Sequence, residues 1–394
     1  MGRIIIFTGK GGVGKTSVAA AHARKAACMG EKTLIVSADM AHNLSDLFEL
    51  PIGKEITCIE GSLYGLEIDP EYEMEHNFSN LVRAMEGMLK GMNGKESEEL
   101  SMLPGIEELF SLLRIQQIYE SQEYEVIIVD CAPTGETLSL LKFPELFAWY
   151  MEKLFPIGKF AMRMLHPVSQ KLFKVELPDG KAMNDIELLY SKLILLQELL
   201  KNREVSSIRL VAIPEKMVVE ETKRNYMYLN LYNFNVDAIF INRILPTDIS
   251  IAFFDQWLLL QSEYIRELEE IFGSIRVYRI KWYDIEIAGM GALDRMIEDV
   301  LTDDKVLEIQ SVLRNEEYEK TENGYQLKVY LPCAKKEDIM MHETGTDIVL
   351  RIGNFKRSIP LPNALRRYRV SGAKVSEQYL WIQFVPLEGG SENE

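Results

Sequence analysis

One short stretch near the N-terminus decides the fold: Gly9-Lys10-Gly11-Gly12-Val13-Gly14-Lys15-Thr16. It satisfies the phosphate-loop pattern G-x-x-x-x-G-K-[ST]. It lies between an expected strand, Arg3–Thr8, and an expected helix, Ser17–Met29. Glycines let the backbone N–H groups of such a loop turn toward phosphate oxygens without Cβ clashes. The motif in this strand–loop–helix setting predicts a nucleotide-binding α/β domain.

The loop residues have separate expected tasks. Lys15 is expected to place its charge on the β and γ phosphates, and Thr16 to offer its hydroxyl to Mg²⁺. The N-terminus of the following helix favours the same anion. Lys10 is a second lysine for which the loop has no structural need. We expect the nucleotide to contact the whole run of Gly9, Lys10, Gly11, Gly12, Val13, Gly14, Lys15, Thr16 and Ser17.

Length and composition exclude several classes of protein. A chain of 394 residues with 47% hydrophobic and 26% charged residues is typical of two or three globular domains. The net charge of −16, from 44 basic and 60 acidic residues, argues against nucleic-acid binding. No apolar run approaches the roughly 18 residues of a transmembrane segment, and the start does not read as a signal peptide. The four cysteines show no Cys-x-x-Cys spacing, so we expect a cytoplasmic protein without zinc.

Up to about residue 312, short apolar runs alternate with long helical stretches. The expected strands are Arg3–Thr8, Thr33–Ala38, Val126–Asp130, Ile208–Ile213, Ala238–Asn242 and Arg276–Ile280. This alternation predicts a parallel sheet with helices on both faces. Residues 70–123 and 136–203 hold only helical patterns, so we expect an inserted helical subdomain within a domain over residues 1–312. Nine of the 18 methionines lie in residues 74–183, where they either fill a helical core or form an adaptable apolar surface.

After residue 315 the pattern changes to short β runs separated by turn residues. The runs are Tyr325–Leu331, Asp347–Ile352, Lys356–Leu361 and Tyr379–Val385. Their alternation predicts a small all-β sandwich over residues 320–388. We interpret Glu316–Glu319 as a charged linker and residues 389–394 as a disordered tail.

With its extra Lys10, the loop sequence K-G-G-V-G-K-T resembles the deviant phosphate loop of the MinD and nitrogenase-iron-protein class of dimeric ATPases. In that class this lysine reaches the nucleotide of the other subunit. The resemblance therefore implies a homodimer with ATP at its interface.

Two further segments resemble the switches of the arsenite-pump ATPase and of its relatives that target tail-anchored membrane proteins. Residues 37–46 resemble switch I, D-P-A-H-S/N-L-S-D, and residues 130–137 resemble switch II, D-T-A-P-T-G-H-T. The resemblance implies that Asp39 orients and polarises the attacking water, and that Asp130 holds Mg²⁺ through water.

Several residues of these segments depart from the family or have a second interpretation. Met40 replaces the family proline, and Cys131 and Glu136 also differ from the family residues. We interpret Asp46 as a helix cap and His42 as a structural or switch contact rather than a base.

Downstream motifs extend the resemblance to about residue 312. They are Ile213-Pro214-Glu215, Glu221-Thr222-Lys223-Arg224 and Ile241-Asn242-Arg243-Ile244-Leu245-Pro246, which match P-E…E-T-x-R and V-N-Q/R-x-L. By position, Glu215 and Asn242 are implied as nucleotide contacts, with Asn242 at the adenine edge. The adenine loop is expected near Lys281 and Trp282, where Trp282 either stacks on adenine or merely packs.

Missing cysteines separate this chain from two branches of the family. Targeting factors bind zinc at the dimer interface through a Cys-x-x-Cys pair from each subunit, whereas Pro246–Phe272 has no cysteine. The arsenite pump binds metalloid through three cysteines in its helical region, and the helical stretches here have none. The pump also has two phosphate loops, whereas this chain has one.

The C-terminal pattern resembles the α-crystallin domain of small heat-shock proteins, which bind extended apolar segments. The resemblance rests on Tyr325–Pro332, Ile359-Pro360-Leu361-Pro362 and Tyr379–Phe384, with Cys333 where glycine is usual. A basic run contains Arg351, Lys356, Arg357, Arg366, Arg367, Arg369 and Lys374. It either docks an anionic partner or the acidic part of this chain, or is a solvated face, the interpretation that we prefer.

These observations predict a Mg²⁺-dependent ATPase with Asp39, Lys10 and Lys15 as catalytic residues. Nucleotide-driven opening and closing of its homodimer is expected to handle a hydrophobic client, a tail-anchored or other apolar polypeptide, for delivery to a membrane. The alternatives are an arsenite-efflux pump-type ATPase subunit, a MinD-like partitioning or assembly ATPase, and a non-enzymatic chaperone with a relic loop.

Overall fold

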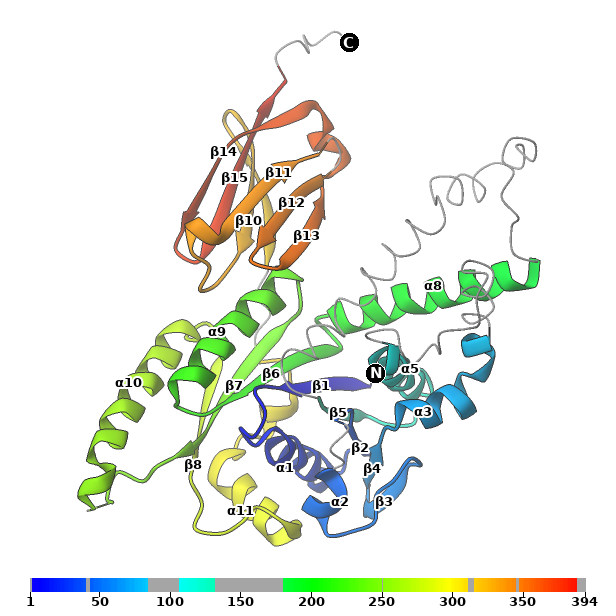
Figure 1. Cartoon of the computed structure of the whole chain (residues 1–394), viewed down its shortest axis with the longest axis vertical. Coiled ribbons are helices and arrows are strands. Elements are labelled where there is room, and N and C mark those ends of the chain that lie inside the picture. Colours follow the sequence, from blue (N-terminus) through cyan, green and yellow to red (C-terminus); the bar gives the residue numbers. More distant parts are fainter. Residues whose placement is uncertain are drawn as a thin grey trace, which may run out of the picture. The chain divides into compact units, whose positions relative to one another are not determined.

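The computed structural model describes residues 2–39, 43–83, 106–131, 180–249, 251–310, 315–344 and 347–387 (Figure 1). The chain forms two compact units. The first consists of Met1–Ile6, Thr16–Val205 and Ile287–Arg295, and the second of Phe7–Lys15, Ser206–Glu286 and Met296–Glu394. Among the helices described, none combines the length and the apolar composition that a membrane crossing requires.

The first unit holds an α/β half in which strands and helices alternate. Its elements are β1 (Arg3–Thr8, whose last two residues belong to the second unit), α1 (Lys15–Cys28), β2 (Thr33–Ser37), α2 (Asn43–Phe48), β3 (Thr57–Glu60), β4 (Leu63–Glu67), α3 (Pro70–Tyr72), the π-helix η1 (Glu73–Asn77), α5 (Ile106–Glu120), β5 (Val126–Asp130) and α8 (Gly180–Lys201). The described parts of the expected helical subdomain are thus helical.

The second unit continues the α/β part and adds a β domain. Its α/β elements are β6 (Ser206–Ala212), α9 (Lys216–Leu231), β7 (Val236–Ile244), η4 (Ala252–Phe254), α10 (Asp255–Ile271), β8 (Arg276–Lys281), the end of α11 (Gly289–Val300) and η5 (Asp304–Leu307). The β domain contains β9 (Glu316–Thr321), β10 (Gly324–Tyr330), η6 (Lys336–Asp338), β11 (Ile339–Glu343), β12 (Asp347–Ile352), β13 (Phe355–Pro360), η7 (Asn363–Arg367), β14 (Tyr368–Ser376) and β15 (Tyr379–Pro386).

Within the first unit the strands follow the order β3-β4-β2-β5-β1, and within the second unit the order is β6-β7-β8. Pairings of β2 with β4 and β5, and of β7 with β6 and β8, are parallel, and only the edge strand β3 pairs antiparallel among the pairs with a described register. Strands β2, β5 and β6 are buried along their whole length, as expected for strands covered on both faces. The expected parallel sheet is confirmed, with β3 and β4 as additions.

The β domain consists of two antiparallel sheets, β14-β15-β10-β9 and β11-β12-β13. Alternate residues of the strands point inward and are buried: Leu327, Val329, Ile348, Leu350, Ile382 and Phe384. The expected all-β sandwich is confirmed. The interpretation of Glu316–Glu319 as a linker is wrong, because these residues form most of β9 and pair with β10.

Within the second unit, the β domain packs on α9. The ring of Tyr228 stacks on Phe355 with ring centroids 3.5 Å apart, and the hydroxyl of Tyr232 donates to the carbonyl oxygen of Lys356. The buried Arg357 donates to the carbonyl of Leu231 and pairs with Glu316. For Arg357, the preferred interpretation of the basic run as a solvated face is wrong, because this arginine docks on the same chain.

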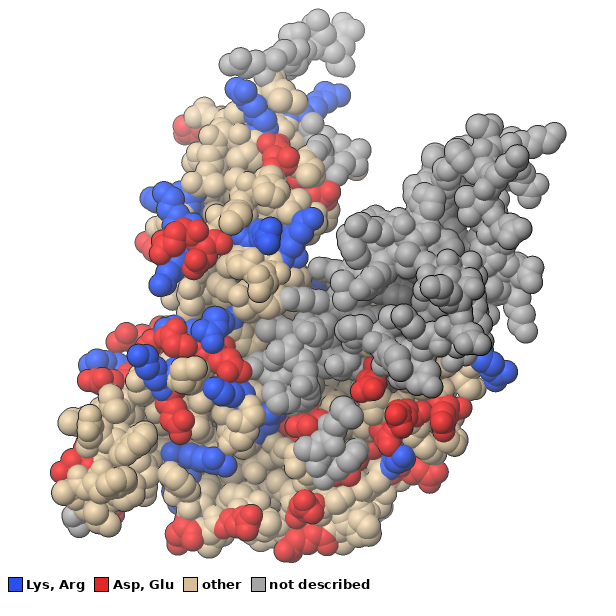
Figure 2. Space-filling model, viewed as in Figure 1, with Lys and Arg blue, Asp and Glu red and all other residues tan. Residues whose placement is uncertain are grey.

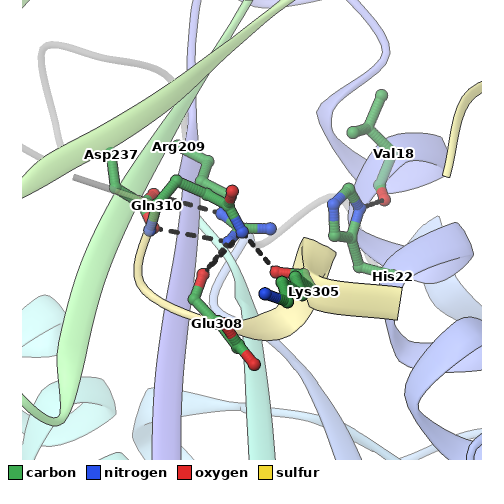
Figure 3. Close-up of polar contacts among 7 residues, drawn as sticks. All are labelled: Val18, His22, Arg209, Asp237, Lys305, Glu308 and Gln310. Atoms are coloured by element: carbon green, nitrogen blue, oxygen red, sulfur yellow. Dashed lines mark hydrogen bonds and ion pairs between the residues drawn. The ribbon is translucent and has the colours of Figure 1, made fainter. Parts of the chain in front are cut away.

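A buried ion pair binds the segment around residues 308–310, which leads toward the β domain (Figure 3). Arg209 on β6 and Asp237 on β7 are both fully buried, with Nε and Oδ1 3.1 Å apart. Arg209 also donates to the carbonyl of Glu308, and Asp237 accepts from the backbone N–H of Gln310. Asn315, which follows this segment, donates to two carbonyls at the end of α9 and beyond it. Side-chain hydrogen bonds therefore fix this segment at residues 308–310 and again at Asn315.

Candidate functional site

In the second unit, the backbone conformation and the neighbours of the phosphate loop explain why three of its positions are glycine. Gly12 and Gly14 have φ of 79° and 91°, in the left-handed region. A Cβ on Gly9 would collide with the carbonyl oxygen of Val211, and a Cβ on Gly14 with the amide of Asn242, whereas the space beside Gly12 is open. The left-handed φ values and the close contacts therefore explain the glycines at these positions, and phosphate binding by the loop stays a prediction.

Asn242, at the end of β7, braces this loop. It is buried, and its Nδ2 donates to the carbonyl of Val13 at 2.9 Å. Its Oδ1 accepts from the backbone N–H of Arg243, a residue with φ of 53°. Both ends of the amide are thus engaged with backbone, and the contact of Asn242 with adenine stays a prediction.

The two loop lysines have different surroundings. Lys15 is buried, and its ammonium group lies 3.4 Å from the carbonyl oxygen of Lys10, inside the loop. Lys10 points its own ammonium group at Glu221 of α9, with Nζ and Oε2 3.5 Å apart and both side chains about one-third exposed. Glu215 stands just before α9 as an exposed residue whose side chain makes no capping hydrogen bond. The ion pair that holds Lys10 is one that water can replace, and the phosphate contact of Lys15 stays a prediction.

Lys281 and Trp282 follow the end of β8. The ammonium group of Lys281 lies 2.7 Å from the carboxylate of Asp299 and 5.3 Å from the ring centre of Tyr283. Trp282 donates its backbone N–H to Ile244, but its side chain is 54% exposed. About half of the Trp282 side chain is therefore open to solvent, and both expectations for it, stacking on adenine and packing on the protein, stay predictions.

In the first unit, the two residues expected at Mg²⁺ lie together. The hydroxyl of Thr16 donates to Oδ2 of the fully buried Asp130 at 2.7 Å. The carbonyl of Asp130 accepts from the backbone N–H of Ala38, so β5 also holds the residue before Asp39. An oxygen-only pair of this kind fits a hard cation, for which hydroxyl and carboxylate oxygens are suitable ligands.

Asp39 begins the segment that resembles switch I. Its backbone N–H donates to the hydroxyl of Ser37 at 3.3 Å, and its side chain is half-buried. Cys131 is buried at the start of the segment that resembles switch II. Met40, His42 and Glu136 lie outside the described residues.

Glu67 at the end of β4 is a buried polar residue that the sequence analysis does not single out. Its Oε1 accepts from the backbone N–H groups of Leu44 and Ser45, at 2.9 and 3.0 Å, in the first turn of α2. Asp46 lies in the same turn but is not the residue that binds these amides, so its interpretation as the cap is wrong. A lone acid at the end of an apolar run, Leu63-Tyr64-Gly65-Leu66-Glu67, was the available signal.

Comparison with known proteins assigns both parts of the chain. The model of the family described as anion-transporting ATPase, ArsA, matches residues 2–302. The chain belongs to the ArsA ATPase family. A second model, described as an HSP20-like domain found in ArsA, matches residues 322–384. The resemblances to the arsenite-pump and targeting ATPases and to small heat-shock proteins are thus confirmed at the level of the family.

Relatives of this ArsA-family chain differ in how much of it they cover. A protein of Aquifex aeolicus named as arsenical pump-driving ATPase 1 is 32% identical over 96% of this chain and 99% of its own length. A protein of Chlorobaculum tepidum with the same kind of name is 34% identical over 97% of this chain and 96% of its own length. The ATPase named get3 of Botryotinia fuckeliana is 30% identical over 76% of this chain and 90% of its own length.

Proposed function

We propose that this chain is a Mg²⁺-dependent ATPase that hydrolyses ATP to ADP and phosphate, and that its homodimer opens and closes around a hydrophobic polypeptide client. The observation that carries the proposal is the phosphate loop, in which Gly12 and Gly14 have positive φ and the ammonium group of the buried Lys15 lies 3.4 Å from the carbonyl oxygen of Lys10. The hydrogen bond from Thr16 to Asp130 supports a cation site at its end. Relatives that are named as ATPases support the reaction.

Each residue of the proposed reaction has one task. Lys15 binds the phosphates, and Thr16 and Asp130 hold Mg²⁺, the latter through water. When bound, this ion neutralises charge on the phosphate oxygens. Asp39 orients and polarises the attacking water. Glu215, Asn242 and Lys281 complete the nucleotide contacts of the proposal.

The proposed dimer depends on Lys10. When the dimer closes, the ammonium group of Lys10 leaves Glu221 and binds the nucleotide of the second copy. An exposed ion pair is worth little, about 0–1 kcal/mol, so it opposes such a movement only weakly. Apolar side chains at η4 and the start of α10 support association: Ile251, Phe253, Trp257 and Leu259 are 59, 72, 50 and 68% exposed. Figure 2 shows a largely uncharged surface at the lower end of α10. No zinc is required by this interface.

The client of the proposal is a tail-anchored or other apolar polypeptide, which the protein carries to a membrane from the cytoplasm. The similarity to an ATPase named get3 and the HSP20-like domain support a polypeptide client. Most of the methionines that could line a client surface lie outside the described residues.

The substitution Asp39→Asn tests the catalytic assignment. It removes the carboxylate while keeping the size of the side chain, so ATP binding is expected to persist while hydrolysis falls by about 10²-fold or more. Phosphate release and equilibrium binding of ATP measure the two effects separately. Hydrolysis at the wild-type rate by the variant would show that Asp39 is not the catalytic carboxylate.

One observation favours a second candidate, an arsenite-efflux pump-type ATPase. The relatives that cover nearly the whole chain, including its β domain, are those named as arsenical pump-driving ATPases. Among the described residues, which include all four cysteines, no three metal-ligating side chains gather at one place. Stimulation of ATP hydrolysis by arsenite that is lost when the exposed Cys28 and Cys58 become serine would favour the pump, and absence of stimulation would favour the polypeptide client.

A further inference from the structure

Three neighbouring strands of the first unit end in one row of buried polar side chains. In the parallel register, Ser37 of β2 is opposite Glu67 of β4 on one side and opposite Asp130 of β5 on the other. Residues in register on parallel strands face the same side of a sheet, because the side chains alternate along each strand. Ser37 and Asp130 are fully buried and Glu67 is 5% exposed. We call Glu67, Ser37 and Asp130 the polar row.

Each member of the polar row binds a different segment. Asp130 accepts the hydroxyl of Thr16, and Ser37 accepts the backbone N–H of Asp39. Glu67 accepts two backbone N–H groups at the start of α2. The row therefore binds the backbone of Asp39 through Ser37 and the backbone of Leu44 and Ser45 through Glu67.

The physical reason for a carboxylate at position 67 lies in α2. The first amides of a helix have no partner within the helix, and a negative charge at this end is favoured by the helix dipole. Helix α2 has only six residues, Asn43–Phe48, which is far too short to be stable by itself. Its first turn is fixed from outside, by charge-assisted hydrogen bonds to Glu67.

We propose that Glu67 is a positioning residue for ATP hydrolysis. It fixes the far end of the short segment that begins at Asp39, and so limits where the carboxylate of Asp39 can stand relative to the attacking water. The inference rests on the proposed function, because it assigns the water-polarising role to Asp39. A displacement of about 1 Å at a reacting group can cost on the order of 10²-fold in rate. The hydrogen bonds of Glu67 to the start of α2 therefore act on kcat rather than on the affinity for ATP.

The variants Glu67→Ala and Glu67→Gln test this role. Alanine removes the acceptor, so kcat for ATP hydrolysis is expected to fall by about 10- to 100-fold. The affinity for a fluorescent ATP analogue is expected to stay unchanged, because the phosphate loop is not touched. Glutamine keeps a side-chain oxygen that can accept from both amides, so it is expected to restore most of kcat.

A matched control is Glu73→Ala in the same unit. Glu73 is another buried glutamate, but its partners are Asn77 and Arg114 rather than α2. Its substitution is expected to leave kcat unchanged. A loss of kcat in this control equal to that of Glu67→Ala would assign the effect to general destabilisation and overturn the proposal.

Hydrogen exchange separates failure of this inference from failure of the proposed function. In Glu67→Ala the amides of Leu44 and Ser45 are expected to lose protection while those of β2 keep it. Unchanged protection, an unchanged kcat, or a loss of ATP affinity together with kcat would each overturn the positioning role. If the wild-type chain protects these amides but does not hydrolyse ATP, the proposed function is wrong, and the role of Glu67 in hydrolysis is overturned with it.

Discussion

Cys333 shows how local surroundings set the chemistry of a single residue. It lies in a turn with φ of 63°, and burial raises the pKa of its thiol to about 11. Because the thiolate is the reactive form, on the order of 0.1% of this thiol is ionised at pH 8. Cys28 and Cys58 are exposed.

We therefore expect iodoacetamide at pH 8 to modify Cys28 and Cys58 well before Cys333. Peptide mapping by mass spectrometry after a short reaction measures the order. Raising the pH toward 11 is expected to speed the modification of Cys333, since its thiolate fraction then rises. Equal labelling of Cys333 and Cys58 at pH 8 in the folded chain would contradict the assigned pKa.

Single residues were predictable from the sequence where a contiguous motif or the end of an expected strand marks them. Lys15 and Thr16 belong to one contiguous motif, so their placement follows from the loop itself. Asp130 was predictable because it ends an apolar run, and carboxyl ends of parallel strands share one edge of the sheet. Glu67 was not predictable in this way, because it ends β4, which is not among the expected strands, and this strand brings Glu67 to Leu44 and Ser45.

At the scale of elements, the ion pair of Arg209 and Asp237 joins two strands to the segment before the β domain. Asp237→Asn keeps the shape but leaves the guanidinium of Arg209 buried without its counter-charge. Breaking a buried pair in this way costs about 3–5 kcal/mol in the free energy of unfolding. We expect urea unfolding, followed by tryptophan fluorescence, to show a loss of this size.

The control for this variant is Asp303→Asn, which breaks the exposed pair with Arg276. Water screens that pair, so its loss is expected to change the free energy of unfolding far less. Equal losses in the two variants would show that burial does not set the contribution of the pair at Asp237.

Elements with a long apolar pattern were predictable, and short or charged ones were not. The bounds of β1 and β5 agree with the expected strands, because four successive apolar residues in each leave little choice. Strand β9 was taken for a linker because its sequence, E-E-Y-E-K-T, is mostly charged. Its pairing with β10 and the contact of Glu316 with Arg357 stabilise it, and neither is visible in the local sequence.

At the scale of the whole molecule, α9 runs from the partner of Lys10, a lysine of the phosphate loop, to the residues that contact the β domain. All of these parts belong to the second unit. The first part of α9 carries Glu221, the partner of Lys10, while Tyr228 in its last turn and Tyr232 directly after it contact β13. A rearrangement of Lys10 on nucleotide binding would therefore act on the helix that carries the β domain. This connection gives a physical reason for the β domain to be part of the same chain as the ATPase.

The central claim is that ATP closes a dimer of this chain, and its mass in solution tests that claim most directly. Light scattering would be recorded with ADP and with a non-hydrolysable ATP analogue, for the wild type and for Lys10→Ala. The account predicts the mass of two chains with the ATP analogue, and a return toward one chain in the variant, which still binds nucleotide through Lys15. A mass that is the same with both nucleotides, or a variant that closes like the wild type, would contradict it.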